Sequence, residues 1–455
     1  MWVAGSKQTE RMRRHDNLFG AIANFGALHA AFRKAIIGKR HKAGAAAFAA
    51  GLERNLLRLE RELIARSWRP GHYVEIQVRD PKPRLVSAAP FRDRVVHHAL
   101  CEVVAPLFDR GFIHHSYANR DGKGTHRAVD RYERWRDDHK YVLRCDIYRY
   151  FPAIDHDCLK ALFRRRITCS DTLWLLDTIV DGSNAQEPVD LYYPGDDLFT
   201  PFVRHRGLPI GNLTSQFFAN VLLDPLDHFV TEVLRAPYLR YVDDFALFHD
   251  DKTVLEEWRA RIAAWLAQKR LALHPRKTVI VETAAPATFL GYTLQPGRRR
   301  LPEDNVRRMR NRLRGLRDRW RAGTVDTAAV TSRIEAWIAH ASHADTWRLR
   351  HAIFRAGWYD PAASATSRAS LRKPGHSPVG GSSAAVPGTT TTGTAAPATA
   401  TGTTPETATG TTPETGTTMP VSAWPARLHA RAERIMVRSG APRVGSGAAI
   451  MSGVA

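Results

Sequence analysis

Three aspartates are the residues of this sequence that most clearly suggest chemistry. Asp243 and Asp244 stand side by side in the apolar stretch "YLRYVDDFALF", and Asp146 ends the strand-like run "KYVLRCD" earlier in the chain. Adjacent carboxylates in apolar surroundings are costly unless a cation neutralises them. Hard oxygen ligands suit Mg²⁺, and two such ions can activate a hydroxyl and stabilise a leaving pyrophosphate. Taken alone, an Asp-Asp pair in a turn is usually a polar surface turn.

The elements around these aspartates must bring them together. Residues 140–151 predict a strand that ends near Asp146, and residues 238–249 predict a strand, a turn with Asp243–Asp244 at its tip, and a second strand. Residues 91–108 and 212–234 have helical patterns. Residues 73–86 alternate and contain two prolines, which favours strands or a hairpin.

A strongly basic helix is predicted over residues 305–321, "NVRRMRNRLRGLRDRWR". One face of it carries an apolar stripe, formed by Val306, Met309, Leu313, Leu316 and Trp320. Eight arginines between residues 307 and 321 surround this stripe. A face of one charge sign repels itself, so we expect it to contact nucleic acid; a solvated basic face over a packed stripe is the alternative.

The composition indicates a folded protein with polyanionic partners. The 455 residues are 44% hydrophobic and carry a net charge of +22, which is enough for two or three domains and favours nucleic acid as a partner. The four cysteines form no CxxC pair, so a zinc finger or a disulfide framework is not expected. No signal peptide and no long apolar run is evident, and we expect a cytoplasmic protein without a membrane partner.

The end of the chain has a different composition. Residues 361–420 are rich in Ala, Thr, Gly, Pro and Ser and repeat the motif "TGTTPET", which predicts a disordered tail. Residues 424–438 could form a short basic helix within it. The expected domains are a helical extension at 1–49, a catalytic region at 50–300, a helical domain at 301–358 and the tail at 359–455.

Seven motifs occur in an order that resembles the reverse transcriptases over nearly all of residues 50–355. In chain order they are "PKPRLVSAAPFRDRVVHHAL", "SYANRDGKGTHRAV", "RCDIYRYFPAID", "GLPIGNLTSQFFAN", "YVDD", "LHPRKT" and "FLGY". The resemblance implies an α+β right-hand polymerase with fingers, a palm of antiparallel sheet plus helices, and a helical thumb. It also implies an RNA-directed DNA polymerase, which uses an RNA template, a DNA or RNA primer and dNTPs.

The resemblance assigns roles to the residues near the three aspartates. Asp146 and Asp243 match the principal ligands of two Mg²⁺ (or Mn²⁺) ions, with Asp244 beside them. Lys277 of "LHPRKT" matches a lysine that protonates the leaving pyrophosphate; an ordinary exposed lysine is the alternative.

Other matching residues concern the substrates. Arg84, assisted by Lys82, matches the fingers position that grips the triphosphate, although both could be plain surface charges. Phe151 matches the bulky ring that excludes a ribose 2′-hydroxyl, with core packing as the alternative. Gly291 matches the glycine of the primer-grip turn. The basic helix would then contact template and primer through Arg307, Arg310, Arg314 and Arg317.

One departure indicates a subtype. Most of the family has Gln-Gly-x-x-x-Ser-Pro where this chain has "IGNLTSQ", so Ile210 replaces the glutamine and Gln216 replaces the proline. This form resembles diversity-generating retroelements, whose enzyme copies an RNA with errors at adenines and works with a small basic accessory protein. Ile210 lacks the hydrogen bonds of glutamine, which would weaken a check on base pairing; simple packing of Ile210 is the alternative.

Other classes of enzyme stay open. Stand-alone defence reverse transcriptases can share the "SQ" variation, and a group II intron-derived enzyme would normally carry a longer region after "FLGY". The Asn-Ala-x-x-His motif of retron enzymes is not found. A catalytically inactive RNA-binding relative is a further alternative, which the three intact aspartates disfavour.

Overall fold

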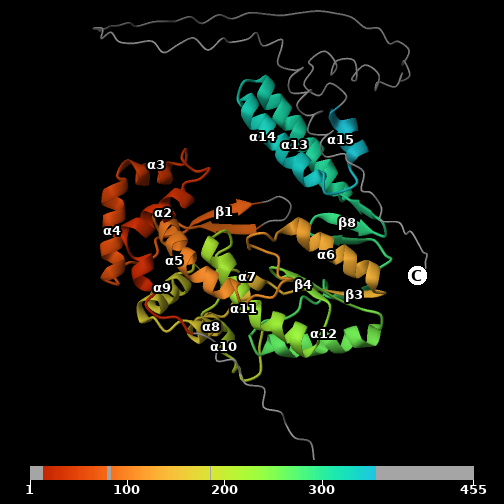
Figure 1. The fold of residues 1–455 in the computed structure, drawn as a ribbon, viewed down its shortest axis with the longest axis horizontal. Helices are drawn as coiled ribbons and strands as arrows, with labels where there is room; N and C mark the ends of the chain where they lie inside the picture. Colours follow the sequence, from red (N-terminus) through yellow and green to blue (C-terminus); the bar gives the residue numbers. More distant parts are fainter. Residues whose placement is uncertain (1–13, 79–83, 185, 355–455) are drawn as a thin grey trace, which may run out of the picture. The chain divides into compact units, whose positions relative to one another are not determined.

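The computed structural model describes residues 14–78, 84–184 and 186–354, with only the backbone of residue 84 (Figure 1). The chain divides into two compact units, with the boundary between Arg298 and Arg299. The predicted tail at 359–455, with the helix expected at 424–438, lies outside the described residues. Among the described helices, none has the length and apolar content that crossing a bilayer requires.

A group of helices opens the first unit. It comprises α1 (Phe19–Ile22), α2 (Phe25–Ala35), α3 (Ala43–Ala50), α4 (Leu52–Ile64) and α5 (Phe91–Asp109). In α4, Leu56, Leu59 and Leu63 recur at helical spacing and are all buried. The Asn24 side chain caps α2 by accepting a hydrogen bond from the Ala27 N–H at 2.9 Å. Between α4 and α5, β1 (Val74–Val78) and β2 (Arg84–Ala88) pair antiparallel.

The sheet that carries the predicted aspartates has four strands. They are β3 (Tyr141–Asp146), β4 (Tyr238–Tyr241), β5 (Asp244–His249) and β6 (Val279–Glu282), in the spatial order β4-β5-β3-β6. Every pair is antiparallel. The prediction of a strand that ends near Asp146 is therefore confirmed, as is the expected mixture of helices with an antiparallel sheet.

Successive side chains of these strands point to opposite faces of the sheet, and both faces are buried. Leu143 and Leu247 belong to the main core, together with α11 (Leu213–His228) and α12 (Lys252–Ala267). On the opposite face, Phe248 contacts Tyr132 of α6 (Thr125–Asp138), with the ring centroids 5.1 Å apart. Figure 1 accordingly shows α6 and α12 on opposite sides of the sheet.

The remaining elements of the first unit join these layers. After β3 come α7 (Tyr150–Ala153), α8 (His156–Arg166), α9 (Ser170–Asp181) and α10 (Thr200–Val203), and a π-helical turn (Phe229–Val233) extends α11. After β6, β7 (Ala287–Phe289) and β8 (Tyr292–Gln295) form a hairpin. The short strand β9 (Arg298–Arg300), which pairs with β8, contains the boundary between the two units. The hairpin packs on α6, since the rings of Tyr132 and Phe289 stack at 4.6 Å.

The second unit is helical in its described part. It contains α13 (Glu303–Arg321), α14 (Thr327–Ala341) and α15 (Trp347–Phe354). Its core includes Leu313 and Leu316 of α13 with Val330, Ile334 and Ile338 of α14. The apolar stripe predicted from the sequence therefore does pack, with Met309 and Trp320 at its margin.

One edge of the four-stranded sheet is covered by a loop. The Arg240 N–H donates to the His115 carbonyl at 3.0 Å, and the Tyr117 N–H donates to the Arg240 carbonyl at 2.9 Å. Residues 115–117 therefore run alongside β4 and satisfy the outward-facing N–H and C=O groups of Arg240.

A buried histidine in α5 makes the stability of the fold depend on pH. His97 is 2% exposed, and its Nε2 has no hydrogen-bond partner among the described residues. Burial, followed by the charges of His98 and Arg94, lowers the pKa of His97 to about 3. An unfolded chain would bind a proton there near pH 6.5, so protonation favours unfolding at lower pH.

We therefore predict that stability falls as the pH drops from about 6.5 toward 3, by up to about 1.4 kcal/mol per pH unit from this group. His97→Leu should flatten that dependence, because the unfolded state then loses its extra proton site. Urea titrations at several pH values measure it. His41→Gln, which replaces an exposed imidazole, is the control; an equal flattening in both variants would exclude His97 as the cause.

Candidate active site

The register of the central sheet brings two of the predicted aspartates together. Asp146, the last residue of β3, lies directly opposite Asp244, the first residue of β5. Asp243 precedes Asp244 in the turn from β4. Asp146 is buried at 9% exposure, and Asp244 is half-buried. The three carboxylates therefore meet at one end of the sheet.

The turn between β4 and β5 differs in one detail from the prediction. Tyr241 pairs with Asp244, so the two central residues of the turn are Val242 and Asp243, and Asp244 already belongs to the strand. Val242 has a φ of +59°, a left-handed conformation that is strained for a β-branched residue. The Arg240 guanidinium donates to the Val242 carbonyl at 3.0 Å and so helps to hold the strained turn.

Lys277 lies beside the same carboxylates. Its Nζ donates to both carboxylate oxygens of Asp146, at 2.8 and 2.7 Å. The preceding loop is anchored on β3, since the His274 N–H donates to the Asp146 carbonyl at 2.7 Å and Ile147 bridges to Leu273. The motif "LHPRKT" therefore places the ammonium group of Lys277 beside the carboxylates.

The electrostatics of Asp244 show how closely the carboxylates approach. Burial, then the charges of Asp243 and Asp146, raise the pKa of Asp244 to about 7, and Lys277 opposes this shift. A hydrogen bond between Asp244 and Asp146 contributes to the same rise. Three carboxylates in this arrangement form a strongly negative site that a cation would stabilise.

The donor set fits a divalent ion, although its arrangement is not that of a loaded site. Carboxylate oxygens are the ligands that Mg²⁺ prefers, and it usually keeps waters and substrate phosphates as the rest of its shell. Within residues 14–354, as far as they are described, no group of three His, Cys, Asp or Glu side chains is arranged to hold a metal. Lys277 supplies the positive charge beside Asp146 instead.

A buried ion pair behind the site escaped the sequence reasoning. Arg240 and Asp227 are both fully buried and are joined by two hydrogen bonds, at 2.7 and 2.6 Å. Asp227 also accepts from the Tyr238 hydroxyl at 2.7 Å, and Arg240 donates to Asn220 at 3.0 Å. The network ties β4 and the turn at Val242–Asp243 to α11. Its only sequence signal was an arginine within an apolar strand pattern.

The predicted substrate residues Phe151 and Ile210 lie in neighbouring segments. The Leu208 N–H donates to the Phe151 carbonyl at 3.0 Å, and Ile210 follows two residues later. Phe151 is half-buried and packs on the main core, which is the arrangement that the alternative interpretation of this ring predicts. Ile210 is half-buried, and its carbonyl accepts from the Ser87 N–H of β2 at 3.1 Å.

A second overlooked residue, Asn212, fastens β2 to this loop. Its buried side chain accepts from the Ala89 N–H at 3.1 Å and donates to the Ser87 carbonyl at 2.9 Å. Such a bidentate clamp needs both atoms of an amide, which the sequence alone did not indicate. Gln216 is half-buried on the first turns of α11.

The fingers residues can be followed only in part. The backbone of Arg84 pairs with Val78 at the start of β2, and its side chain is outside the described part of the chain. Lys82 lies wholly outside the described residues.

The predicted primer-grip and thumb residues occupy separate units. Gly291 has a φ of +86° in the β7–β8 turn, a conformation that favours glycine. Its neighbour Leu290 also has a positive φ, of +45°. The side chains of α13 that we expect to face nucleic acid are exposed or half-buried at Arg307, Arg310, Arg314 and Arg317.

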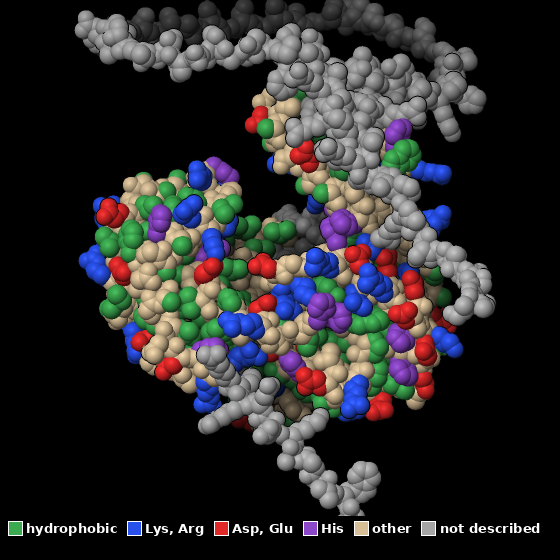
Figure 2. Space-filling model, in the orientation of Figure 1, with side chains coloured by type: hydrophobic (Ala, Val, Ile, Leu, Met, Phe, Trp, Pro, Cys, Tyr) green, Lys and Arg blue, Asp and Glu red, His purple; other side chains and the backbone are tan. Residues whose placement is uncertain are grey.

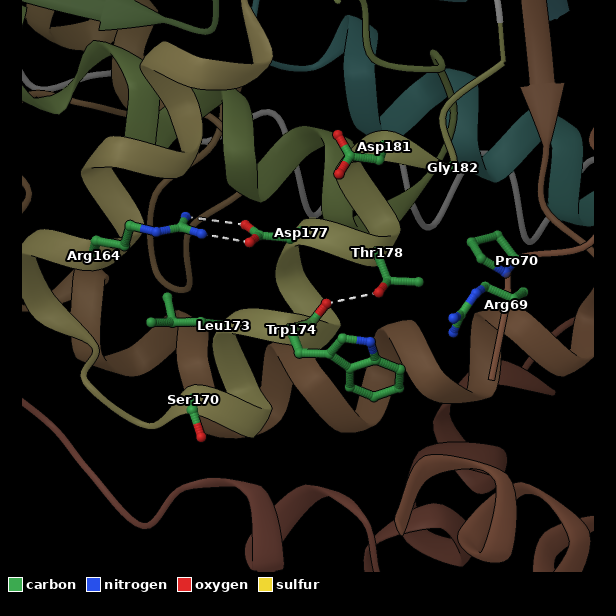
Figure 3. Close-up of a pocket in the computed structure, with 10 residues that line it drawn as sticks. All are labelled: Arg69, Pro70, Arg164, Ser170, Leu173, Trp174, Asp177, Thr178, Asp181 and Gly182. Carbon is green, nitrogen blue, oxygen red and sulfur yellow. Dashed lines mark hydrogen bonds and ion pairs between the residues drawn. The ribbon is translucent and has the colours of Figure 1, made fainter. Parts of the chain in front are cut away.

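A sizeable concavity lies away from these residues. The pocket in Figure 3 has a volume of about 710 Å³ and is lined mainly by α9, with Trp174 and an Arg164–Asp177 ion pair. None of the predicted site residues lines it. The carboxylate site is therefore identified by its chemistry, and this cavity is not part of it.

Part of the chain that contains this site is similar to known proteins. Residues 76–294 match the family model described as "Reverse transcriptase (RNA-dependent DNA polymerase)". Protein YkfC of Escherichia coli (strain K12) is 23% identical over 299 residues, covering 55% of this chain and 75% of that protein.

Solved structures of telomerase are among those that resemble the chain. Apo telomerase from Candida tropicalis, truncated from its C-terminal domain, is 14% identical with a TM-score of 0.36, covering 50% of this chain and 53% of that one. Telomerase from Candida albicans, in complex with a fragment of telomeric RNA, is 14% identical with a TM-score of 0.33, covering 51% and 46%. The chain thus spans about half the length of these structures.

The family match covers all three aspartates, Lys277 and Gly291. Residues 76–294 are therefore identified as a reverse transcriptase (RNA-dependent DNA polymerase) domain.

Proposed function

We propose that this reverse transcriptase makes cDNA by two-metal nucleotidyl transfer, as the polymerase of a diversity-generating retroelement in the cytoplasm. The fingers and palm would occupy residues 50–300, after a helical extension at 1–49, and the thumb residues 301–358. The observation that carries the catalytic part is the Asp146–Asp244 pairing, with Asp243 and Lys277 beside it.

The chain's own residues would divide the work. Asp146, Asp243 and Asp244 would hold two Mg²⁺ or Mn²⁺ ions, which supply Lewis-acid activation of the primer hydroxyl and charge stabilisation at the phosphates. Lys277 would leave Asp146 for the substrate phosphates and donate a proton to the leaving pyrophosphate. The Arg240 network would keep the backbone of the aspartate turn in place while Lys277 leaves and the carboxylates take up the ions.

Primer extension on an RNA template tests this function directly. Purified protein should extend a DNA primer with dNTPs in Mg²⁺ or Mn²⁺ and should stop when EDTA is added. Calorimetric binding of Mn²⁺ without substrate gives an independent readout, because wild type should bind it more tightly than Asp146→Asn. Extension that persists in EDTA would contradict the two-metal proposal.

The retroelement part rests on "IGNLTSQ" and on where it lies. Ile210 stands in the loop that β2 contacts through Ser87, near the Phe151 segment. A template-repeat RNA would be copied with errors at adenines, and a small basic accessory protein would assist. A stand-alone defence enzyme is the second candidate, because enzymes of that class can share the "SQ" sequence. A group II intron-derived enzyme is a further alternative.

Ile210→Gln tests the proposed source of errors. We predict that it lowers misincorporation opposite adenine by about threefold to tenfold, because the amide restores polar contacts that distinguish correct pairs. Sequencing of cDNA from an adenine-rich RNA measures the effect. Ile210→Leu keeps an apolar side chain and serves as the control; the same error spectrum in all three proteins would show that fidelity is set elsewhere.

The arginines of α13 should make template binding depend on salt. We predict that template–primer affinity falls by at least about tenfold between 50 and 200 mM salt, because phosphate contacts release counterions. Arg310→Ala together with Arg314→Ala should reduce the slope of log Kd against log salt by about 1 to 2. Fluorescence anisotropy measures both the affinity and its salt slope. An affinity that does not change with salt concentration would rule out this electrostatic role.

A further inference from the structure

A cluster of basic side chains lies at the start of α6 and in the loop before it. We refer to His114, Lys123, Arg127, Arg131 and Arg134 as the α6 cluster. His114, Arg127 and Arg134 are exposed, and the other two are half-exposed. In Figure 2, Lys, Arg and His side chains gather around the position of α6, with acidic ones among them.

Hydrogen bonds within the loop keep these cationic side chains in place. Lys123 donates to the His114 carbonyl at 2.7 Å and contacts the His114 ring nitrogen at 3.3 Å. Arg127 donates to the Gly122 carbonyl. Arg120 anchors the loop from inside by donating to Asp109 at 2.6 Å and to the Ile113 carbonyl at 2.7 Å.

Two members of the cluster, His114 and Lys123, are influenced by the positive charges around them. Lys123 first, then burial and three arginines, lower the pKa of His114. Burial, then Arg120 and Arg127, lower the pKa of Lys123, and Asp109 is the acid that opposes them. Asp109 is already bound by Arg120. Since like charges raise one another's energy, a bound polyanion would relieve this repulsion.

Acidic residues on the same elements only partly balance the charge. Residues 110–138, which end with α6, hold seven Lys and Arg against five Asp and Glu, besides three histidines. Two of the acids, Asp137 and Asp138, lie at the far end of α6, and Arg136 donates to Asp137 at 2.7 Å. The stretch from the loop to Arg134 therefore keeps an excess of positive charge.

Aromatic rings lie among the cations. Lys123 stands 5.7 Å from the Tyr117 ring centroid, and Arg131 stands 5.2 Å from that of Trp135. Trp135 is half-exposed. Tyr117 is buried, so Trp135 is the ring of this pair that solvent reaches. Cations beside a half-exposed ring suit nucleic acid, because phosphates meet the cations while an unpaired base can contact the ring.

We propose that the α6 cluster is a second nucleic-acid site, which binds the phosphodiester backbone of single-stranded RNA outside the template–primer duplex. This proposal rests on the proposed function, in which the protein copies an RNA template. The α6 cluster is a separate surface, because the proposed catalytic reaction does not require it. The site is joined to the catalytic turn through the Thr125 hydroxyl, which donates to the Tyr241 hydroxyl at 3.1 Å. RNA held there would keep the template molecule attached during synthesis.

The test compares two ligands on one variant. Lys123→Ala combined with Arg127→Ala should weaken binding of poly(U) of about 40 nucleotides by about tenfold at low salt. The slope of log Kd against log salt should fall by about 1.4, since each single-stranded phosphate contact contributes about 0.7. Extension of a short template–primer duplex without a single-stranded RNA overhang beyond the copied nucleotides should stay unchanged.

Matched controls separate charge from position. Arg259→Ala with Arg261→Ala removes two exposed arginines from α12 and should leave poly(U) binding as in wild type. Lys123→Arg with Arg127→Lys keeps both charges and should retain at least half of the affinity. Equal melting temperatures by circular dichroism would show that each variant is folded.

Several outcomes would overturn the proposal. Unchanged poly(U) affinity in the Ala variant would do so, as would an equal loss of short-duplex extension, which would assign the cluster to the catalytic path. Inorganic phosphate or polyglutamate that competes as well as poly(U), at equal charge, would show an anion site without preference for RNA. Failure of wild type to extend primers would contradict the catalytic proposal alone, because poly(U) binding is measured without dNTPs.

Discussion

Asp244→Asn should reduce primer extension by about a thousandfold or more while making the metal-free protein more stable. The loss of activity follows from removing one carboxylate of three that would hold the ions. The gain in stability follows from burial beside Asp243 and Asp146, which raises the pKa of Asp244 to about 7. Above that pH an ionised Asp244 opposes folding, so a neutral amide should add about 1 to 3 kcal/mol.

Two measurements check this opposite behaviour. Single-turnover extension in Mg²⁺ gives the activity, and urea unfolding in EDTA at pH 8 gives the free energy of unfolding. Asp138→Asn, at an exposed position at the end of α6, should change neither. Near-normal extension by Asp244→Asn would remove Asp244 from the active site, and a lower stability would contradict the electrostatic account of the carboxylate group.

The second large effect concerns the buried ion pair behind the turn. Arg240→Met should destabilise the protein by about 3 to 5 kcal/mol, because it leaves the fully buried Asp227 without its partner. Adding Asp227→Leu should recover most of that loss, since an apolar pair can replace a buried ion pair. Arg164→Met breaks the more exposed pair with Asp177 and should cost about 1 kcal/mol or less.

Activity should not recover with stability in the double variant. Arg240 also donates to the Val242 carbonyl and to Asn220, and no apolar side chain can replace those bonds. We expect the Arg240→Met/Asp227→Leu protein to extend primers about 10-fold to 100-fold more slowly than wild type, with the same dNTP KM. Full activity in the double variant would show that Arg240 serves stability alone.

The sequence alone predicted the helices and strands whose formation depends on a local pattern of apolar residues. The stripe of α13, the helix α5 and the strand that ends at Asp146 each follow from apolar spacing within a short window. The motif order then located the carboxylates, because it identifies a domain whose strands pair in a known way. The same reasoning placed Lys277 near Asp146, at 2.7 Å in the structure.

The rest depends on contacts between distant segments. Nothing local to Arg240 shows that its partner is Asp227 on α11, or that both are fully buried. The clamp of Asn212 on β2 likewise joins residues far apart in the chain. The turn was misplaced by one residue because hydrophobic alternation does not fix register, whereas the pairing of Tyr241 with Asp244 does.

The loop that covers β4 has a consequence for association between molecules. A bare edge strand offers a row of free N–H and C=O groups onto which another chain can add a strand, and apolar edge strands are common starting points of aggregation. The bonds that join Arg240 to His115 and Tyr117 occupy the outward-facing groups of Arg240, next to the turn at Val242–Asp243. A second copy of the chain could therefore add a strand at Arg240 only by displacing this loop.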